Sequence, residues 1–245
     1  MANIDDILQL AIQTGGSDVF LIPGSRVSIK LSGAVQPILD DVLKPDDTRR
    51  LLEQVYRLDR RDMDRLIEHG DDDFSFSVSG VGRFRCNAYK QRNSLAMVLR
   101  VVSLHLPDPE KMHIPKEVLD LADVKKGLVL VTGPAASGKS TTLACVIDRI
   151  NNMRRGHIIT IEDPIEFIHP HRKSVVSQRE IEHDTDSYKT ALRAALRQAP
   201  DVILLGEMRD FETIQTALTA AETGQLVLST LHTIGAAKTI DRIID

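Results

Sequence analysis

Nine residues near the middle of the chain have the types and spacing of a phosphate-binding loop. They read Gly-Pro-Ala-Ala-Ser-Gly-Lys-Ser-Thr and fit the pattern G-x-x-x-x-G-K-[ST]. In such a loop the backbone amides and the N-terminus of the following helix point at anionic oxygens. We therefore expect Lys139 to reach the β- and γ-phosphates of a nucleoside triphosphate, and the Ser140 hydroxyl to bind Mg²⁺. The predicted nucleotide-binding residues of the loop are Gly133, Pro134, Ala135, Ala136, Ser137, Gly138, Lys139, Ser140 and Thr141.

Carboxylates follow two apolar stretches downstream of this loop. Glu207 follows the stretch 201–206, and we expect it beside the loop, where it would hold Mg²⁺ directly or through water. A second stretch runs into Glu162, Asp163 and Glu166, which are candidates for contacting the nucleotide and for a base or water-orienting group. For Glu207, a plain strand followed by a surface acid is the alternative interpretation.

A histidine ends a third apolar stretch. His232 follows residues 226–231, and a lone histidine at a strand end is more often structural. Ligand sites of open α/β sheets, however, lie at the carboxyl ends of strands, so His232 is a candidate sensor of the γ-phosphate. The remaining histidines lack helical metal spacing, and we expect His169 and His171 in a solvated loop.

The elements that must position these side chains follow from the hydrophobic pattern. The C-terminal half alternates apolar strands with helices, which predicts a parallel sheet built from βαβ units. Strands are predicted at 128–132, 157–162, 174–177, 201–206 and 226–231, and helices at 139–151, 187–199, 211–223 and 236–245.

The N-terminal half has a different pattern, typical of a smaller α/β unit with an antiparallel sheet. A run of three acids at 71–73 is interpreted as a solvated turn, and three prolines within 104–117 indicate a stiff linker. We therefore predict a domain at 1–103, a linker at 104–124 and a second domain at 125–245. The N-terminal elements are predicted at 3–14, 46–57 and 59–68 for helices, and at 18–22, 27–31, 74–78, 82–90 and 95–102 for strands.

Composition narrows the classes of function. With 42% hydrophobic residues the chain can bury a core, while 4% aromatic residues, no Trp and a net charge of −4 do not favour nucleic-acid binding. Cys86 and Cys145 lack metal or disulfide spacing, so we expect both in the core. The N-terminus does not resemble a signal peptide, and no apolar run approaches the length of a membrane span, which predicts a cytoplasmic protein without membrane insertion.

Together these motifs resemble a known family. The loop, the acid-rich segment 161–167, Gly-Glu-Met-Arg-Asp at 206–210 and Thr-Leu-His-Thr at 230–233 are similar to those of the secretion ATPases of type II secretion and type IV pili. Segment 191–201 fits as well, and the likeness is greatest to the pilus-retraction, or twitching-motility, branch. In the N-terminal half, residues 16–18, 73–76 and 82–88 also resemble family segments, so the resemblance covers essentially the whole chain.

The resemblance implies a RecA-like P-loop ATPase core, a smaller N-terminal α/β (PAS-like) domain, and ATP with Mg²⁺ as cofactors. It assigns Glu166 as the catalytic glutamate, Glu207 as the metal-coordinating glutamate of the Walker B strand, and His232 as the second histidine of a histidine box. It also implies that arginines of the N-terminal domain approach the phosphates when the domains close; Arg85 and Arg100 are our candidates, with Arg83 possible.

Members of this family form hexameric rings whose domain rotation removes pilin subunits at an inner-membrane platform. The resemblance thus implies a homohexamer, a platform-protein partner, and a location peripheral to the inner face of the cytoplasmic membrane. Three alternatives stay open: an assembly ATPase of a pilus or of type II secretion, a nucleotide-binding regulator without useful turnover, and, more weakly, a DNA translocase. Assembly ATPases usually carry a longer N-terminal extension and a four-cysteine zinc motif, which this sequence lacks.

The chain departs from the family pattern at four places. Phe20 and Gln225 stand where the family usually has histidine, and Ala135-Ala136 replace Thr-Gly in the loop. Losing a glycine stiffens the loop without removing its amides. The family's C-terminal helical domain is missing beyond Asp245, so we expect a fragment or shortened form, in which hexamer assembly would be impaired.

Overall fold

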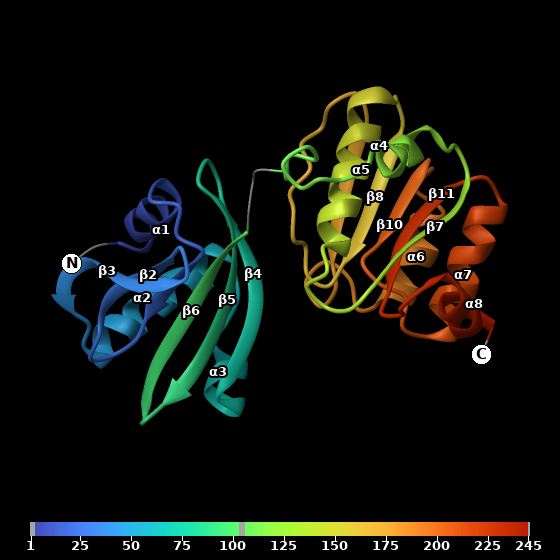
Figure 1. The fold of residues 1–245 in the computed structure, drawn as a ribbon. Coiled ribbons are helices and arrows are strands. Elements are labelled where there is room, and N and C mark those ends of the chain that lie inside the picture. Colours follow the sequence, from blue (N-terminus) through green and yellow to red (C-terminus); the bar gives the residue numbers. More distant parts are fainter. Residues whose placement is uncertain (1–2, 103–105, 245) are drawn as a thin grey trace. The chain divides into compact units, whose positions relative to one another are not determined.

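The computed structural model describes residues 3–102 and 106–244. It divides into two compact units, residues 1–104 and 105–245, each of which is described by itself (Figure 1). The boundary predicted between 103 and 104 lies outside the described residues, and so does Asp245 at the end of the last predicted helix.

The N-terminal unit is built on an antiparallel sheet with the strand order β3-β2-β1-β6-β5-β4. Its strands are β1 (Asp18–Leu21), β2 (Arg26–Leu31), β3 (Ala34–Val42), β4 (Asp71–Val78), β5 (Gly82–Gln91) and β6 (Ser94–Val102), and its helices are α1 (Ile4–Gln13), α2 (Pro45–Leu58) and α3 (Asp64–His69). Strand β3 was not predicted, because this edge strand is largely exposed and so lacks apolar alternation, and because it contains Pro37.

One face of this sheet is buried and the other is polar. Along β5, Phe84 and Cys86 are buried while Arg85 and Asn87 are exposed, which is the two-residue period of a half-buried strand. The apolar face of α1 and the apolar face of α2 share one core with the inward residues. Cys86 therefore lies in the core, as predicted.

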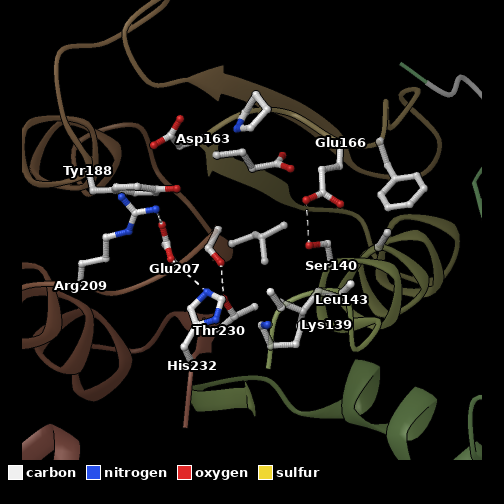
Figure 2. A pocket seen from close by; sticks show the side chains of 18 of the residues that line it. Lys139, Ser140, Leu143, Asp163, Glu166, Tyr188, Glu207, Arg209, Thr230 and His232 are labelled. Atoms are coloured by element: carbon white, nitrogen blue, oxygen red, sulfur yellow. Dashed lines mark hydrogen bonds and ion pairs between the residues drawn. The ribbon is translucent and has the colours of Figure 1, made fainter. Parts of the chain in front are cut away.

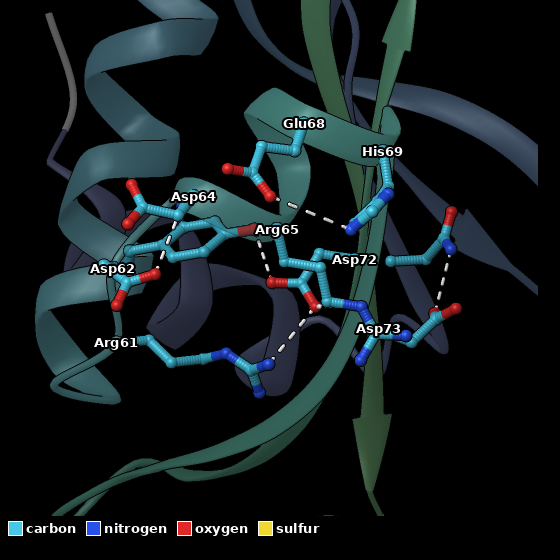
Figure 3. Close-up of polar contacts among 10 residues, drawn as sticks. Arg61, Asp62, Asp64, Arg65, Glu68, His69, Asp72 and Asp73 are labelled. Atoms are coloured by element: carbon cyan, nitrogen blue, oxygen red, sulfur yellow. Dashed lines mark hydrogen bonds and ion pairs between the residues drawn. The ribbon is translucent and has the colours of Figure 1, made fainter.

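The acid run at 71–73 is part of a strand, so the predicted solvated turn is wrong. Asp72 is only 1% exposed, and its carboxylate accepts a 2.9 Å hydrogen bond from the Tyr56 hydroxyl. The guanidinium groups of Arg61 and Arg65 lie 3.3 and 3.7 Å from the same carboxylate (Figure 3). Strand alternation turns the middle acid inward, and these partners compensate the cost of burying its charge.

The C-terminal unit contains a parallel sheet with the order β7-β11-β10-β8-β9. Its strands are β7 (Gly127–Thr132), β8 (His157–Glu162), β9 (Val175–Glu180), β10 (Val202–Leu205) and β11 (Leu226–Leu231). Its helices are α4 (Lys116–Leu119), a 3₁₀ turn (Asp120–Asp123), α5 (Lys139–Met153), α6 (Tyr188–Ala195), α7 (Phe211–Glu222) and α8 (Ala236–Ile244).

Helices cover both faces of the parallel sheet (Figure 1). In β10, Val202 and Leu204 join the core formed with α5, while Ile203 and Leu205 join the core formed with α6 and α7. Burial on both faces explains why these strands are continuous apolar runs in the sequence. Because the strands are parallel, their carboxyl ends lie at one edge of the sheet, where the candidate side chains follow.

The second half of the predicted linker packs onto this unit. Helix α4 and the 3₁₀ turn precede β7, Ala122 is fully buried, and Arg149 of α5 donates a 2.9 Å hydrogen bond to Asp120. Over residues 3–102 and 106–244, every helix is too short or too polar to cross a membrane.

Candidate functional site

The predicted phosphate loop connects β7 to α5, as the sequence indicated. Position 133 requires glycine because the Ser137 side chain lies close to its backbone: a Cβ there would lie 2.7 Å from the Ser137 hydroxyl oxygen. Gly138 ends the loop with a φ of 90°. Ala136 adopts a φ of 59°, a left-handed conformation that costs a non-glycine residue about 1–2 kcal/mol. The alanine that departs from the family pattern therefore adds backbone strain rather than stiffness alone.

Lys139 points its ammonium group back into the loop. Its side chain is buried, and Nζ donates hydrogen bonds to the carbonyl oxygens of Gly133 (3.1 Å) and Pro134 (2.8 Å). Among the described residues no carboxylate lies within ion-pair distance of this ammonium. The loop thus holds a positive charge balanced only by carbonyl dipoles, an arrangement suited to an anionic ligand.

Most of the predicted residues line one pocket of about 290 Å³ above the loop (Figure 2). The predicted residues that line it are Ala135, Ala136, Lys139, Ser140, Glu162, Asp163, Glu166, Glu207 and His232. The other loop residues, which shape the turn and the start of α5 without lining the pocket, are Gly133, Pro134, Ser137, Gly138 and Thr141.

Glu166 lies closest to the start of α5. It is exposed, on the connection that follows β8, and its Oε1 accepts a 3.2 Å hydrogen bond from the Ser140 hydroxyl (Figure 2). This contact joins the predicted metal-binding hydroxyl to the predicted catalytic carboxylate. The structure therefore brings together two roles that lie 26 residues apart in the sequence.

Glu207 lies on the opposite side of the pocket, between a cation and a histidine. One carboxylate oxygen pairs with the Arg209 guanidinium, and the other lies 3.4 Å from Nε2 of His232. The hydroxyl of Thr230 donates a 2.6 Å hydrogen bond to the Gly206 carbonyl, which fastens the end of β11 to the end of β10. This bond fixes the spacing between the strand ends that carry Glu207 and His232.

Glu162 is held by its own sheet rather than by the loop. Its carboxylate accepts hydrogen bonds from the Thr160 hydroxyl (2.5 Å) and from the Gln178 amide (3.3 Å). Partial burial at the strand end raises the pKa of Glu162 to about 7, although both hydrogen bonds act in the opposite direction. Asp163 is more exposed at the pocket rim.

Sequence reasoning missed Tyr188 and Arg209, both of which line the pocket. Tyr188 opens α6 directly after the helix-capping Ser187, and a Cβ at Gly206 would lie 2.8 Å from its hydroxyl oxygen. Burial, together with the charges of Asp163 and Glu207, raises the pKa of Tyr188. The sequence signals for Arg209 were the charged cluster that follows Glu207 and the family-like segment 206–210.

His169 is also part of this pocket, and its predicted place in a solvated loop is wrong. It is 6% exposed, and burial lowers its pKa to about 4. The backbone amide of His169 is bonded to Gln178, which draws this part of the loop onto the sheet. His171 is exposed, as expected, and its Nδ1 accepts a hydrogen bond from the Val176 amide.

The candidate arginines lie in the N-terminal unit. Arg85 on β5 and Arg100 on β6 are directly paired across the sheet and lie on its polar face. Arg100 donates a 2.9 Å hydrogen bond to Asp18, and Arg83 donates one of 3.2 Å to Ser77. Their approach to a nucleotide stays a prediction.

Gln225, one of the two departures from the family's histidines, lies at the end of β11 away from the pocket's polar groups. Gln225 immediately precedes β11, whereas His232 immediately follows it, so the six-residue strand separates them by about 20 Å. The Gln225 side chain accepts a hydrogen bond from Thr223 instead. Phe20 is half-buried in β1 of the N-terminal unit.

Comparison with known proteins places this geometry in a family. A family model described as "Type II/IV secretion system protein" matches residues 1–245. The chain belongs to the type II/IV secretion system protein family. The resemblance and the RecA-like fold class inferred from the motifs are thereby confirmed.

Curated relatives of this family member include a retraction ATPase and a twitching protein. The chain is 46% identical over 244 residues to the type IV pilus retraction ATPase PilT of Pseudomonas aeruginosa. This alignment covers 99% of the chain and 70% of PilT. It is 54% identical over 173 residues to a twitching motility protein of Neisseria gonorrhoeae, covering 71% of the chain and 46% of that protein.

Solved structures agree with these relatives. The crystal structure of the pilus retraction motor PilT with bound ADP superposes with a TM-score of 0.89 at 46% identity, covering the whole chain and 71% of that structure. The ATPase DotB of Legionella pneumophila superposes with a TM-score of 0.81 at 30% identity, covering 98% of the chain and 68% of DotB. Family membership and the ADP-bound neighbour imply that this family member binds a nucleotide.

Proposed function

We propose that this family member is the core of an ATP-hydrolysing motor that powers type IV pilus retraction. Close similarity to a pilus retraction ATPase and to a twitching motility protein supports a secretion-ATPase motor. The observation that carries the hydrolytic assignment is the convergence of Lys139, Ser140, Glu166 and Glu207 on one pocket.

The residues of the pocket fit ATP and Mg²⁺. The Lys139 ammonium has no carboxylate partner among the described residues, so it can form ion pairs with the β- and γ-phosphates. The Ser140 hydroxyl and the Glu207 carboxylate are the hard oxygen ligands that Mg²⁺ prefers, and no cluster of three or more His, Cys, Asp or Glu competes for a metal within residues 3–102 and 106–244. Mg²⁺ usually combines one or two such ligands with phosphate oxygens.

The carboxylates of Glu166 and Glu207 have different roles in this proposal. When bound, Mg²⁺ neutralises charge that develops on the β- and γ-phosphates. Glu166, exposed beside Ser140, orients the attacking water and accepts its proton. Glu207 is the carboxylate that would bind the metal. The His232 ring lies 3.4 Å from Glu207 and immediately follows β11, so it couples a change at that carboxylate to the end of the strand.

Force production requires more than one subunit. We infer a homohexamer in which Arg85 and Arg100 of the N-terminal domain complete the phosphate site when the domains close. The partner of the ring is a pilus platform protein of the inner membrane, at whose cytoplasmic face the motor works. These inferences come from the family resemblance and from the names of the relatives.

The test is ATP hydrolysis by the purified chain as a function of protein concentration, with Glu166→Gln as the control. The rate per subunit should rise with concentration, because assembly completes the site, and it should fall by roughly 10²–10⁴-fold in the control. A fluorescent ATP analogue should bind the control with unchanged affinity. Tight nucleotide binding without hydrolysis by a chain that has assembled would contradict the motor and favour a regulator. The same result from a chain that stays monomeric would mean that the site is not completed by a neighbouring subunit.

A further inference from the structure

The connection that carries Glu166 is fastened by the neighbouring edge strand. This connection leaves β8 at Glu162 and returns to the sheet at β9. Two side chains of β9, Gln178 and Glu180, bind its backbone on both sides of Glu166. Neither of these residues lines the pocket, and neither has yet been linked to Glu166.

Gln178 uses both ends of its amide. Its carbonyl oxygen accepts a 2.7 Å hydrogen bond from the His169 backbone N–H, and its Nε2 donates 2.9 Å to the Phe167 carbonyl. The same Nε2 donates 3.3 Å to Glu162. One side chain thus joins the end of β8 to the two residues that flank Ile168.

Glu180 holds the other side. It is 5% exposed, and its carboxylate accepts a 2.9 Å hydrogen bond from the backbone N–H of Ile165, the residue before Glu166. Its own backbone N–H donates 2.8 Å to Asp184, which fixes the end of β9. The bound backbone groups of Ile165 and Phe167 therefore bracket Glu166.

The register of the sheet explains why Gln178 and Glu180 both bind the connection that carries Glu166. Gln178 is paired with Thr160 and Glu180 with Glu162 in the parallel β8–β9 ladder, and residues two apart on a strand point to the same side. Arg179 lies between them and bonds instead to the Asp184 carbonyl. The alternation of Gln178-Arg179-Glu180 therefore aims two hydrogen-bonding side chains at the connection.

We propose that Gln178 and Glu180 are positioning residues that hold Glu166 against Ser140 and so set the rate of ATP hydrolysis. This proposal rests on the catalytic role of Glu166 in the proposed function. The backbone groups that they bind would otherwise have to shift to find new partners, since an unpaired buried polar group is costly. A displacement of the catalytic carboxylate by about 1 Å is enough to slow catalysis roughly 100-fold.

The first variant is Gln178→Met, which keeps the length of the side chain and removes its amide. We expect kcat to fall roughly 10–100-fold, with KM and the affinity for a fluorescent ATP analogue unchanged within about threefold. The matched control is Ser177→Ala on the same strand, which removes a 2.9 Å bond to the His157 ring and leaves the connection alone. A kcat loss in Ser177→Ala equal to that in Gln178→Met would overturn the proposal.

Glu180 allows a test by conservative replacement. Glu180→Gln keeps an oxygen acceptor for the Ile165 N–H, whereas Glu180→Met removes it. We expect kcat of the glutamine variant to exceed that of the methionine variant roughly tenfold, as one charge-free hydrogen bond allows. Equal losses of kcat in the two variants would show that the hydrogen bond to Ile165 does not position Glu166.

Hydrogen–deuterium exchange separates this proposal from the proposed function. Peptides covering 163–169 should exchange faster in Gln178→Met than in the wild type or in Ser177→Ala, whether or not the chain hydrolyses ATP. Faster exchange with full ATPase activity would refute the positioning role. An assembled wild-type chain that binds ATP, shows the exchange protection and never hydrolyses ATP would instead refute the proposed function.

Discussion

The hydroxyl of Ser140 donates a 3.2 Å hydrogen bond to the carboxylate of Glu166. Ser140 lies in the first turn of helix α5 and Glu166 on the connection after β8, so this bond joins two separate parts of the pocket. Metal binding at the hydroxyl and proton transfer at the carboxylate are thus expected within a few ångströms of each other.

Ser140→Ala should separate nucleotide binding from metal binding. Without the hydroxyl, Mg²⁺ loses a ligand, so the tightening of nucleotide affinity by Mg²⁺ should fall by about 1.5 kcal/mol, or roughly tenfold. Affinity measured in EDTA should stay as in the wild type. Titration of a fluorescent nucleotide with and without Mg²⁺ decides this, and an unchanged Mg²⁺ effect would remove Ser140 from the metal site.

Lys139→Ala should abolish nucleotide binding with or without Mg²⁺. The buried ammonium is the positive charge of the loop, and its loss should weaken affinity at least about 100-fold. Lys189→Ala is the control for charge alone, because Lys189 pairs with Glu212 at the surface. Binding by Lys139→Ala at wild-type affinity, in the same fluorescence titration, would contradict the site.

Gly206→Ala should destabilise the C-terminal unit through a single contact. The added Cβ would lie 2.8 Å from the Tyr188 hydroxyl oxygen, an overpacking that costs about 1–3 kcal/mol. Tyr188→Phe removes that oxygen, so the double variant should recover at least half of the loss. Urea denaturation of the four proteins in this cycle measures the coupling, and strictly additive effects would exclude the contact.

Ala136→Gly should stabilise the chain. Glycine adopts a φ of 59° without the Cβ penalty, and we expect a gain of about 1 kcal/mol in the free energy of unfolding. Ala135→Gly, one residue earlier and outside the left-handed region, should instead lower stability by about 0.5–1 kcal/mol. If both variants lose stability by the same amount, Ala136 is not strained.

Glu162 should make the stability of the ligand-free chain depend on pH. Its pKa of about 7 lies above the usual value of 4.5, so the folded state binds the extra proton between these values. The stabilisation is complete below pH 4.5 and is lost as the pH rises through 7. Between pH 5 and 8 the wild type should lose about 2 kcal/mol relative to Glu162→Gln. Urea denaturation across this range measures the two free energies of unfolding. If both proteins show the same dependence on pH, the raised pKa of Glu162 is disproved.

The sequence reveals what depends on local pattern. Strands buried on both faces appear as apolar runs, and the polar residue at the end of each run then marks the pocket, as for Glu207 and His232. Strand β3 lacks that signal because its side chains are exposed.

What escapes prediction depends on contacts between distant residues. The buried Asp72 carboxylate depends on the distant partners Tyr56 and Arg61, and the buried His169 is bonded through its backbone amide to Gln178. The left-handed conformation of Ala136 likewise follows from the closure of the loop, which no local preference of alanine indicates.

Strand β9 is the last strand in the sheet order and hydrogen-bonds to β8 alone among the named strands. Glu166 is thus fastened to a rim of the sheet with a neighbour on one side only. A displacement of β9 relative to β8 would change the position of the Glu166 carboxylate while the phosphate loop stays in place. With the catalytic role proposed for Glu166, displacement of this edge strand would change the rate of hydrolysis while nucleotide binding at the loop continues.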